Sequence, residues 1–230
     1  MIAIIGAMQV EVDEILKLAT KVKKIEVNNH SFYQAEINGK ECVITISGIG
    51  KVNASMATTT LLNIFEISKV INIGTAGGLK DYEQVLDIVI GSRVTYHDLN
   101  VPGWPKSFDI ESENISTKYV FKSDKDLISA SLSAIKSKKN VYIGDILTGD
   151  TFVTKNEVNQ IIKDYPSAIA CEMEAAAIAH VCDKYEIPFV VIRSLSDITI
   201  KDGNDITFDE YVKLASKRSA IFVADLILTI

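Results

Sequence analysis

The sequence has few cysteines and no long apolar run. Its three cysteines, Cys42, Cys171 and Cys182, each lie in apolar surroundings, and an odd, scattered set predicts small buried side chains rather than a disulfide framework. No stretch approaches the roughly 18 apolar residues of a membrane-spanning helix, and the first residues lack the basic segment of a secretory signal. We therefore expect a cytoplasmic protein that does not associate with membranes.

The sequence also lacks a basic run and the common nucleotide-binding motifs. The formal net charge is -6, and no part of the chain forms the basic face that neutralises phosphates. The histidines His30, His97 and His180 are far apart, so no metal site is predicted. The glycine fingerprints of dinucleotide and triphosphate sites are missing, as is the serine-hydrolase elbow. We expect no nucleic-acid partner and no cofactor, but a small neutral or zwitterionic substrate fits.

The pattern of apolar residues predicts an α/β protein. Apolar residues make up 47% of the 230 residues and charged residues 23%, as in ordinary globular proteins. Strands are predicted at residues 2–7, 32–37, 41–46, 70–73, 85–96, 141–147, 168–171 and 188–192, and helices at 9–20, 51–65, 125–137, 155–163, 175–184 and 208–227. This alternation indicates one three-layer domain over residues 1–230, with a mixed central sheet covered by helices.

Carboxylates follow three of the predicted strands, where burial disfavours a charge. Glu11 follows the first strand and its glycine, Glu172 and Glu174 follow a short strand, and Asp197 follows the last strand. Ligands of open α/β sheets bind outside the carboxyl ends of the strands, and a buried charge must be paired or hydrogen-bonded. We therefore expect these carboxylates to meet in one acidic pocket.

Each of these residues also has an ordinary interpretation when it is taken alone. Glu11 and Glu174 fit acids in a first helical turn, where the helix dipole favours them. Asp197 fits a helix cap or a turn. Met173 and Phe152 fit core side chains.

Seven short motifs along the chain together carry a resemblance to a known family. They are Gly6-Ala7-Met8-x-x-Glu11, Ser47-Gly48-Ile49-Gly50-Lys51, Gly74-Thr75-Ala76-Gly77-Gly78, Tyr96-His97-Asp98, Gly149-Asp150-x-Phe152, Glu172-Met173-Glu174 and Arg193-Ser194-x-Ser196-Asp197. In this set and order the sequence resembles the 5′-methylthioadenosine/S-adenosylhomocysteine nucleosidases over essentially its whole length. The resemblance implies the nucleoside phosphorylase-like fold, whose mixed sheet forms a distorted barrel flanked by helices. It also implies hydrolysis of the N-glycosidic bond of these two adenine nucleosides.

The resemblance implies roles for the matching residues of this chain. Glu11 would activate the attacking water, which is the co-substrate, and Glu174 would accept hydrogen bonds from the ribose hydroxyls. Asp197 would protonate purine N7, and Phe152 would stack on adenine. The other residues implied to bind substrate or line the water site are Met8, Ile49, Thr75, Ala76, Gly77, Val153, Glu172, Met173, Arg193 and Ser196.

The resemblance also implies a homodimer in which a loop of one subunit covers the pocket of the other. Val101 and Trp104, which follow Tyr96-His97-Asp98, match that loop. A large apolar side chain in a loop rich in proline and glycine fits such a lid. Packing of Trp104 against its own subunit is the alternative.

Three other functions compete with this interpretation. A purine nucleoside phosphorylase on the same fold would need a cationic phosphate site, and Glu11 in the first loop would repel phosphate. A nucleoside-binding module without turnover would not need an acid for N7. A nucleosidase for a related adenine nucleoside, such as 5′-deoxyadenosine or aminodeoxyfutalosine, would use the same residues.

Overall fold

The computed structural model of the protein describes residues 1–100, 119–135, 140–202 and 204–230. In this part of the chain ten strands form one mixed sheet, and six helices pack on it. The strands are β1 (Ile2–Gly6), β2 (Thr20–Val27), β3 (His30–Ile37), β4 (Lys40–Ile46), β5 (Lys69–Gly78), β6 (Ile88–Tyr96), β7 (Phe121–Lys122), β8 (Val141–Thr148), β9 (Ala168–Glu172) and β10 (Phe189–Ile198). The helices are α1 (Gln9–Leu16), α2 (Lys51–Ile64), α3 (Lys125–Ala134), α4 (Lys155–Asp164), α5 (Ala175–Lys184) and α6 (Asn204–Ile227).

Five of the strands close on themselves as a barrel. β10 pairs with β6, β6 with β8, β8 with β9, β9 with β5, and β5 with β10. The β10–β6 and β9–β5 pairs are antiparallel and the other three are parallel. From β5 the sheet continues outward through β1, β4, β3 and β2. The expected mixed sheet with a distorted barrel is therefore confirmed.

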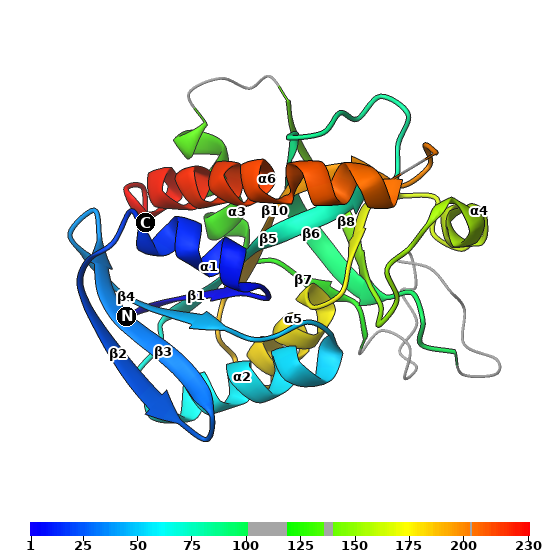
Figure 1. Cartoon of the computed structure of the whole chain (residues 1–230). Coiled ribbons are helices and arrows are strands. Elements are labelled where there is room, and N and C mark those ends of the chain that lie inside the picture. The colour runs from blue at the N-terminus through cyan, green and yellow to red at the C-terminus, as the bar shows by residue number, and fades with distance from the viewer. Residues whose placement is uncertain (101–118, 136–139, 203) are drawn as a thin grey trace.

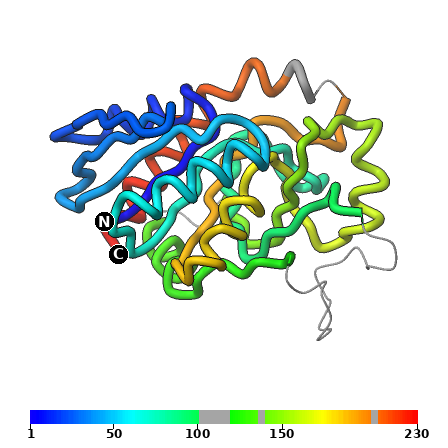
Figure 2. The backbone as a smooth tube through the Cα atoms, turned by 90° about the horizontal axis from the view of Figure 1, so that it is seen from below, coloured from blue at the N-terminus to red at the C-terminus, as the bar shows by residue number. Residues whose placement is uncertain are grey.

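Helices cover both faces of the sheet, as Figure 1 shows. α1, α3 and α6 lie on one side, and α2 and α5 lie on the other. β1 is buried on both faces, which explains its unbroken apolar sequence. Ile2 and Ile4 pack in the apolar cluster shared with α1 and α6, whereas Ala3 and Ile5 pack in the cluster shared with α2 and α5. The two chain termini lie near each other at one end of the molecule (Figure 2).

Several elements differ from their predicted extents. β5 continues through its glycine-rich segment to Gly78, because main-chain pairing does not require side chains. β10 continues to Ile198 and pairs with this segment of β5. α1 ends at Leu16 and is followed by β2, a strand that was not predicted. Most residues of β2 are exposed and many are charged, which suits an edge strand but removes the apolar alternation that would reveal it.

The cysteines are buried, as the sequence predicted. Cys42, Cys171 and Cys182 are buried free thiols. In the described residues, no helix is both long enough and apolar enough to cross a membrane.

Candidate active site

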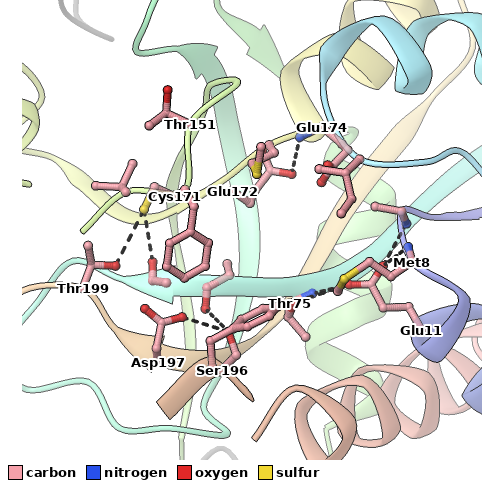
Figure 3. Close-up of a pocket in the computed structure, with 18 residues that line it drawn as sticks. Met8, Glu11, Thr75, Thr151, Cys171, Glu172, Glu174, Ser196, Asp197 and Thr199 are labelled. Atoms are coloured by element: carbon pink, nitrogen blue, oxygen red, sulfur yellow. Dashed lines mark hydrogen bonds between the residues drawn. The ribbon is translucent and has the colours of Figure 1, made fainter. Parts of the chain in front are cut away.

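A cavity of about 360 Å³ brings the expected carboxylates together (Figure 3). Its volume lies in the range of small-molecule sites. The expected residues that line it are Met8, Glu11, Ile49, Thr75, Ala76, Gly77, Phe152, Val153, Glu172, Met173, Glu174, Ser196 and Asp197. The lining residues that were not predicted are Ala7, Thr151, Cys171, Thr199 and Phe208. Arg193 is buried and is not among the residues that line the cavity, and Val101 and Trp104 lie outside the described residues.

Glu11 lies in the first turn of α1, and its carboxylate reaches across to β5. One carboxylate oxygen accepts hydrogen bonds from the N–H groups of Ala7 (2.8 Å) and Met8 (3.0 Å), and the other accepts one from the Thr75 N–H (3.0 Å). Burial raises the pKa of Glu11, while the charge of Arg193 and these backbone donors lower it in part. The carboxylate is therefore held in place but is more basic than an exposed glutamate, as a general base requires.

Gly74 leaves the space in which Glu11 and Arg193 approach β5. A Cβ atom at Gly74 would lie 3.0 Å from a carboxylate oxygen of Glu11 and 3.3 Å from the guanidinium carbon of Arg193. Any side chain at this position would displace one of these two groups. The glycine-rich segment that was expected to end the strand instead lets β5 form one wall of the site.

Glu172 ends β9 and forms a buried ion pair with Arg193, at 2.6 Å. The same carboxylate accepts hydrogen bonds from the N–H groups of Glu174 (3.0 Å) and Ala175 (2.8 Å), and from the Thr148 hydroxyl. Breaking such a pair leaves an uncompensated charge in the interior. Both oxygens of Glu172 are thus engaged by groups of the protein itself.

Glu174 precedes α5 and faces the same cavity (Figure 3). In the described part of the chain its carboxylate accepts one hydrogen bond, from the Gly50 N–H at 2.8 Å. Burial, together with the nearby charge of Glu172, raises the pKa of Glu174 to about 8. The carboxyl group is positioned from one side and turns its other side to the cavity.

Asp197 lies in β10 directly after a break in the pairing register between Leu195 and Asp197. It is buried, and it accepts a hydrogen bond from the Ser196 hydroxyl at 2.9 Å. A Cβ atom on Gly77 would lie 3.1 Å from the other carboxylate oxygen and 2.3 Å from the Thr199 hydroxyl. Glycine is therefore needed where Asp197 and Thr199 approach β5.

Two aromatic rings meet at the cavity. Phe152 and Phe208 pack edge to face, with ring centroids 5.4 Å apart and planes at 75°. The Phe152 residue is 40% exposed, so the core interpretation of this side chain does not hold. Phe208 reaches the cavity from α6, and nothing in the sequence distinguishes it from the other apolar residues of that helix.

The described residues contain no group of three or more histidine, cysteine, aspartate or glutamate side chains that could hold a metal ion. The charged residues that line the cavity there are all carboxylates. The closed barrel, the helices on both sides and the acidic cavity fit the nucleoside phosphorylase-like fold that the sequence predicted. The model of the phosphorylase superfamily matches residues 1–228, so the protein belongs to this class.

Close relatives narrow this class to one family. The 5′-methylthioadenosine/S-adenosylhomocysteine nucleosidase of Psychromonas ingrahamii is 39% identical over 229 residues, which cover 98% of this chain and 97% of that protein. The structure of the nucleosidase of the same name from Neisseria meningitidis, in complex with methylthio-immucillin-A, has a TM-score of 0.91 and 38% identity and covers 100% and 99% of the two chains. The protein belongs to the 5′-methylthioadenosine/S-adenosylhomocysteine nucleosidase family, which confirms the resemblance of its seven motifs.

One further structural relative carries a different name. The futalosine hydrolase of Helicobacter pylori has a TM-score of 0.88 and 26% identity, and the match covers 100% of this chain and 97% of that one. A protein named for a different substrate therefore shares this fold.

Proposed function

We propose that the protein hydrolyses the N-glycosidic bond of 5′-methylthioadenosine and S-adenosylhomocysteine, releasing adenine and the corresponding 5-thioribose. The observation that carries this proposal is the meeting of Glu11, Glu174 and Asp197 in one cavity, with no basic side chain among its described lining residues. Such a cavity suits a neutral sugar and a leaving group that takes up a proton. The names of the close relatives support the same substrates.

In the proposed reaction Asp197 gives its proton to purine N7, so that adenine leaves as a neutral base when the bond between C1′ and N9 breaks. The sugar then gains oxocarbenium character. Glu11 takes a proton from a water molecule whose oxygen bonds to C1′. Each positioned proton-transfer group typically contributes about 10²–10⁴ in rate. The supporting geometry is the Ser196 hydrogen bond to Asp197 and the backbone cradle of Glu11.

Glu174 accepts hydrogen bonds from the ribose hydroxyls in this mechanism. Hydrogen bonds donated to a carboxylate favour its ionised form, so substrate binding lowers the raised pKa of Glu174. A charge held below the ring then stabilises the positive sugar in the transition state. The Phe152 ring stacks on adenine, and the Phe208 ring packs edge to face against the Phe152 ring.

A phosphorylase reaction is the first alternative to test. Arg193, which is buried, already forms an ion pair with Glu172, and Glu11 would repel phosphate. We expect adenine release from 5′-methylthioadenosine to be independent of phosphate and to yield free methylthioribose. Chromatography of the sugar product, with and without phosphate, checks this. Methylthioribose 1-phosphate as the main product would refute the hydrolase assignment.

A nucleosidase for another adenine nucleoside is the second alternative, and the likeness to a futalosine hydrolase favours including it. The two nucleosides to compare are 5′-deoxyadenosine and aminodeoxyfutalosine. We expect kcat/KM to be highest for 5′-methylthioadenosine or S-adenosylhomocysteine. A higher value for aminodeoxyfutalosine would reassign the substrate.

We also propose that the protein acts as a homodimer. Three apolar side chains of the segment that begins α2, Ile49, Val52 and Met56, are 52%, 68% and 55% exposed, and a partner subunit would bury them. Val101 and Trp104 are proposed to cover the pocket of the partner. Sedimentation analysis tests the dimer, and a monomer at micromolar concentration with full activity would contradict it.

A further inference from the structure

Three motif residues have no part in the proposed chemistry. Lys51, Asp98 and Asp150 come from the start of α2, the segment after β6 and the segment after β8. None of them lines the cavity in the described structure. They nevertheless meet beside it, in one connected set of hydrogen bonds.

The contacts among these residues join all three segments. The Lys51 ammonium group lies 2.6 Å from an Asp98 carboxylate oxygen and 3.5 Å from one of Asp150. The Asp150 N–H donates to Asp98 at 2.9 Å, and the Lys51 N–H donates to Asp150 at 2.8 Å. The start of α2 is therefore fixed both through the Lys51 side chain and through its backbone.

This set of contacts is connected to Glu174 of the proposed active site through Gly50. Gly50, the residue before Lys51, donates its N–H to Glu174 at 2.8 Å. Gly50 has a φ of +92°, and a Cβ atom there would lie 3.0 Å from the Asp150 carboxylate, so only glycine suits this position. Consecutive N–H groups at the start of one helix thus bind Glu174 on the cavity side and Asp150 on the other.

From this arrangement we infer that Lys51, Asp98 and Asp150 are positioning residues that hold the Gly50 N–H against Glu174. They thereby fix the carboxylate that receives the ribose hydroxyls. The inference rests on the proposed function. Lys51 and Asp98 are partly exposed, and pairs of this kind contribute little to global stability. Their effect is on the geometry of Glu174, where a displacement of about 1 Å can cost about 100-fold in rate.

The test compares two substrates that differ only in the groups that Glu174 binds. They are 5′-methylthioadenosine and its 2′,3′-dideoxy analogue. In Asp150→Ala we expect kcat/KM to fall about 10- to 100-fold for 5′-methylthioadenosine, but about threefold or less for the analogue, which gives Glu174 no hydroxyl to accept. Asp150→Asn keeps an acceptor oxygen for the Lys51 N–H and should recover most of the lost activity.

Two controls make the result decisive. Lys21→Met breaks the exposed ion pair with Glu36 and should leave kcat/KM for both substrates unchanged. If Asp150→Ala melts below the assay temperature, Lys51→Met takes its place and is measured on the same two substrates. Equal losses on both substrates, or no loss on either, overturn the positioning role. A wild-type protein that does not release adenine from 5′-methylthioadenosine instead overturns the proposed function, so the two failures are distinguishable.

Discussion

Glu172, at the end of β9, is surrounded by hydrogen-bond donors of the protein, whereas Glu174, at the start of α5, accepts one backbone hydrogen bond and faces the cavity. The two residues are only two positions apart, and both line the same cavity. Glu172 also has a buried countercharge in Arg193. The pKa of Glu174, in contrast, is raised by burial and by Glu172 itself.

This difference separates a carboxylate that supports the fold from one that is available to a ligand. Glu172 already accepts four hydrogen bonds from groups of the described protein, so it has little acceptor capacity left for a ligand hydroxyl. At Glu174 a ligand hydroxyl would add a hydrogen bond without displacing one. The remaining acceptor capacity of Glu174 is therefore what suits it to the ribose hydroxyls in the proposed function.

The largest effect is expected from Glu172→Gln, which removes the countercharge of Arg193. Breaking a buried ion pair by removing one partner typically costs about 3–5 kcal/mol. We expect the free energy of unfolding to fall by about that amount, as measured by denaturant titration. A variant with unchanged stability but abolished turnover would show that Glu172 acts on the substrate, and the contrast with Glu174 would fail.

Glu174→Gln should lose activity rather than stability. Turnover of 5′-methylthioadenosine is expected to fall about 10²–10³-fold, the usual cost of removing one group that stabilises transition-state charge. Stability at neutral pH should be higher than that of the wild type, because glutamine cannot ionise and so avoids the charge that burial and Glu172 disfavour. Steady-state kinetics and denaturant titration on the same preparation check both parts. A large loss of stability would place Glu174 among the structural carboxylates.

The pH dependence of stability gives a third contrast. Above its ordinary pKa of 4.5 Glu174 ionises in the unfolded chain, while the folded protein keeps the proton up to a pH of about 8. The folded state then binds more protons, so stability falls as pH rises through this window, by up to about 1.4 kcal/mol per pH unit for one proton. Glu11, whose pKa is also raised, acts in the same direction.

Glu174→Gln lacks this titration and should lose less stability than the wild type between pH 5 and pH 8, roughly the interval between the two pKa values. Denaturant midpoints across the interval, measured without ligand, provide the comparison. Parallel curves for the two proteins would mean that Glu174 ionises alike in both states.

The sequence predicted the order of most elements because buried strands and amphipathic helices have distinct periods. It missed β2, whose exposed charged residues carry no apolar alternation. It also ended β5 at the glycines, since composition alone does not show that Gly74 makes room for Glu11 and Arg193.

The sequence also predicted only part of the candidate site. The seven motifs identified the family, and strand ends indicated where carboxylates would gather. The resemblance assigned the ribose role to Glu174 and placed Glu172 among the binding residues. The motifs could not show that Glu172 is already paired with Arg193, because its partners come from distant segments. They also could not find Phe208, which differs from its apolar neighbours on α6 only in facing Phe152.

The smallest effect is expected at Phe208, where no carboxylate is involved. Edge-to-face aromatic pairs contribute about 0.5–1.5 kcal/mol beyond the area they bury. Phe208→Leu keeps an apolar side chain but loses this contact, so Phe152 is held less firmly against the base. We expect KM for 5′-methylthioadenosine to rise about two- to tenfold, with kcat nearly unchanged because Phe208 touches no reacting atom. Phe222→Leu, on the same helix but packed against the apolar cluster that α6 shares with α1 and β1, is the matched control and should leave KM unaltered. If both variants raise KM equally, the effect comes from α6 as a whole and not from the aromatic pair.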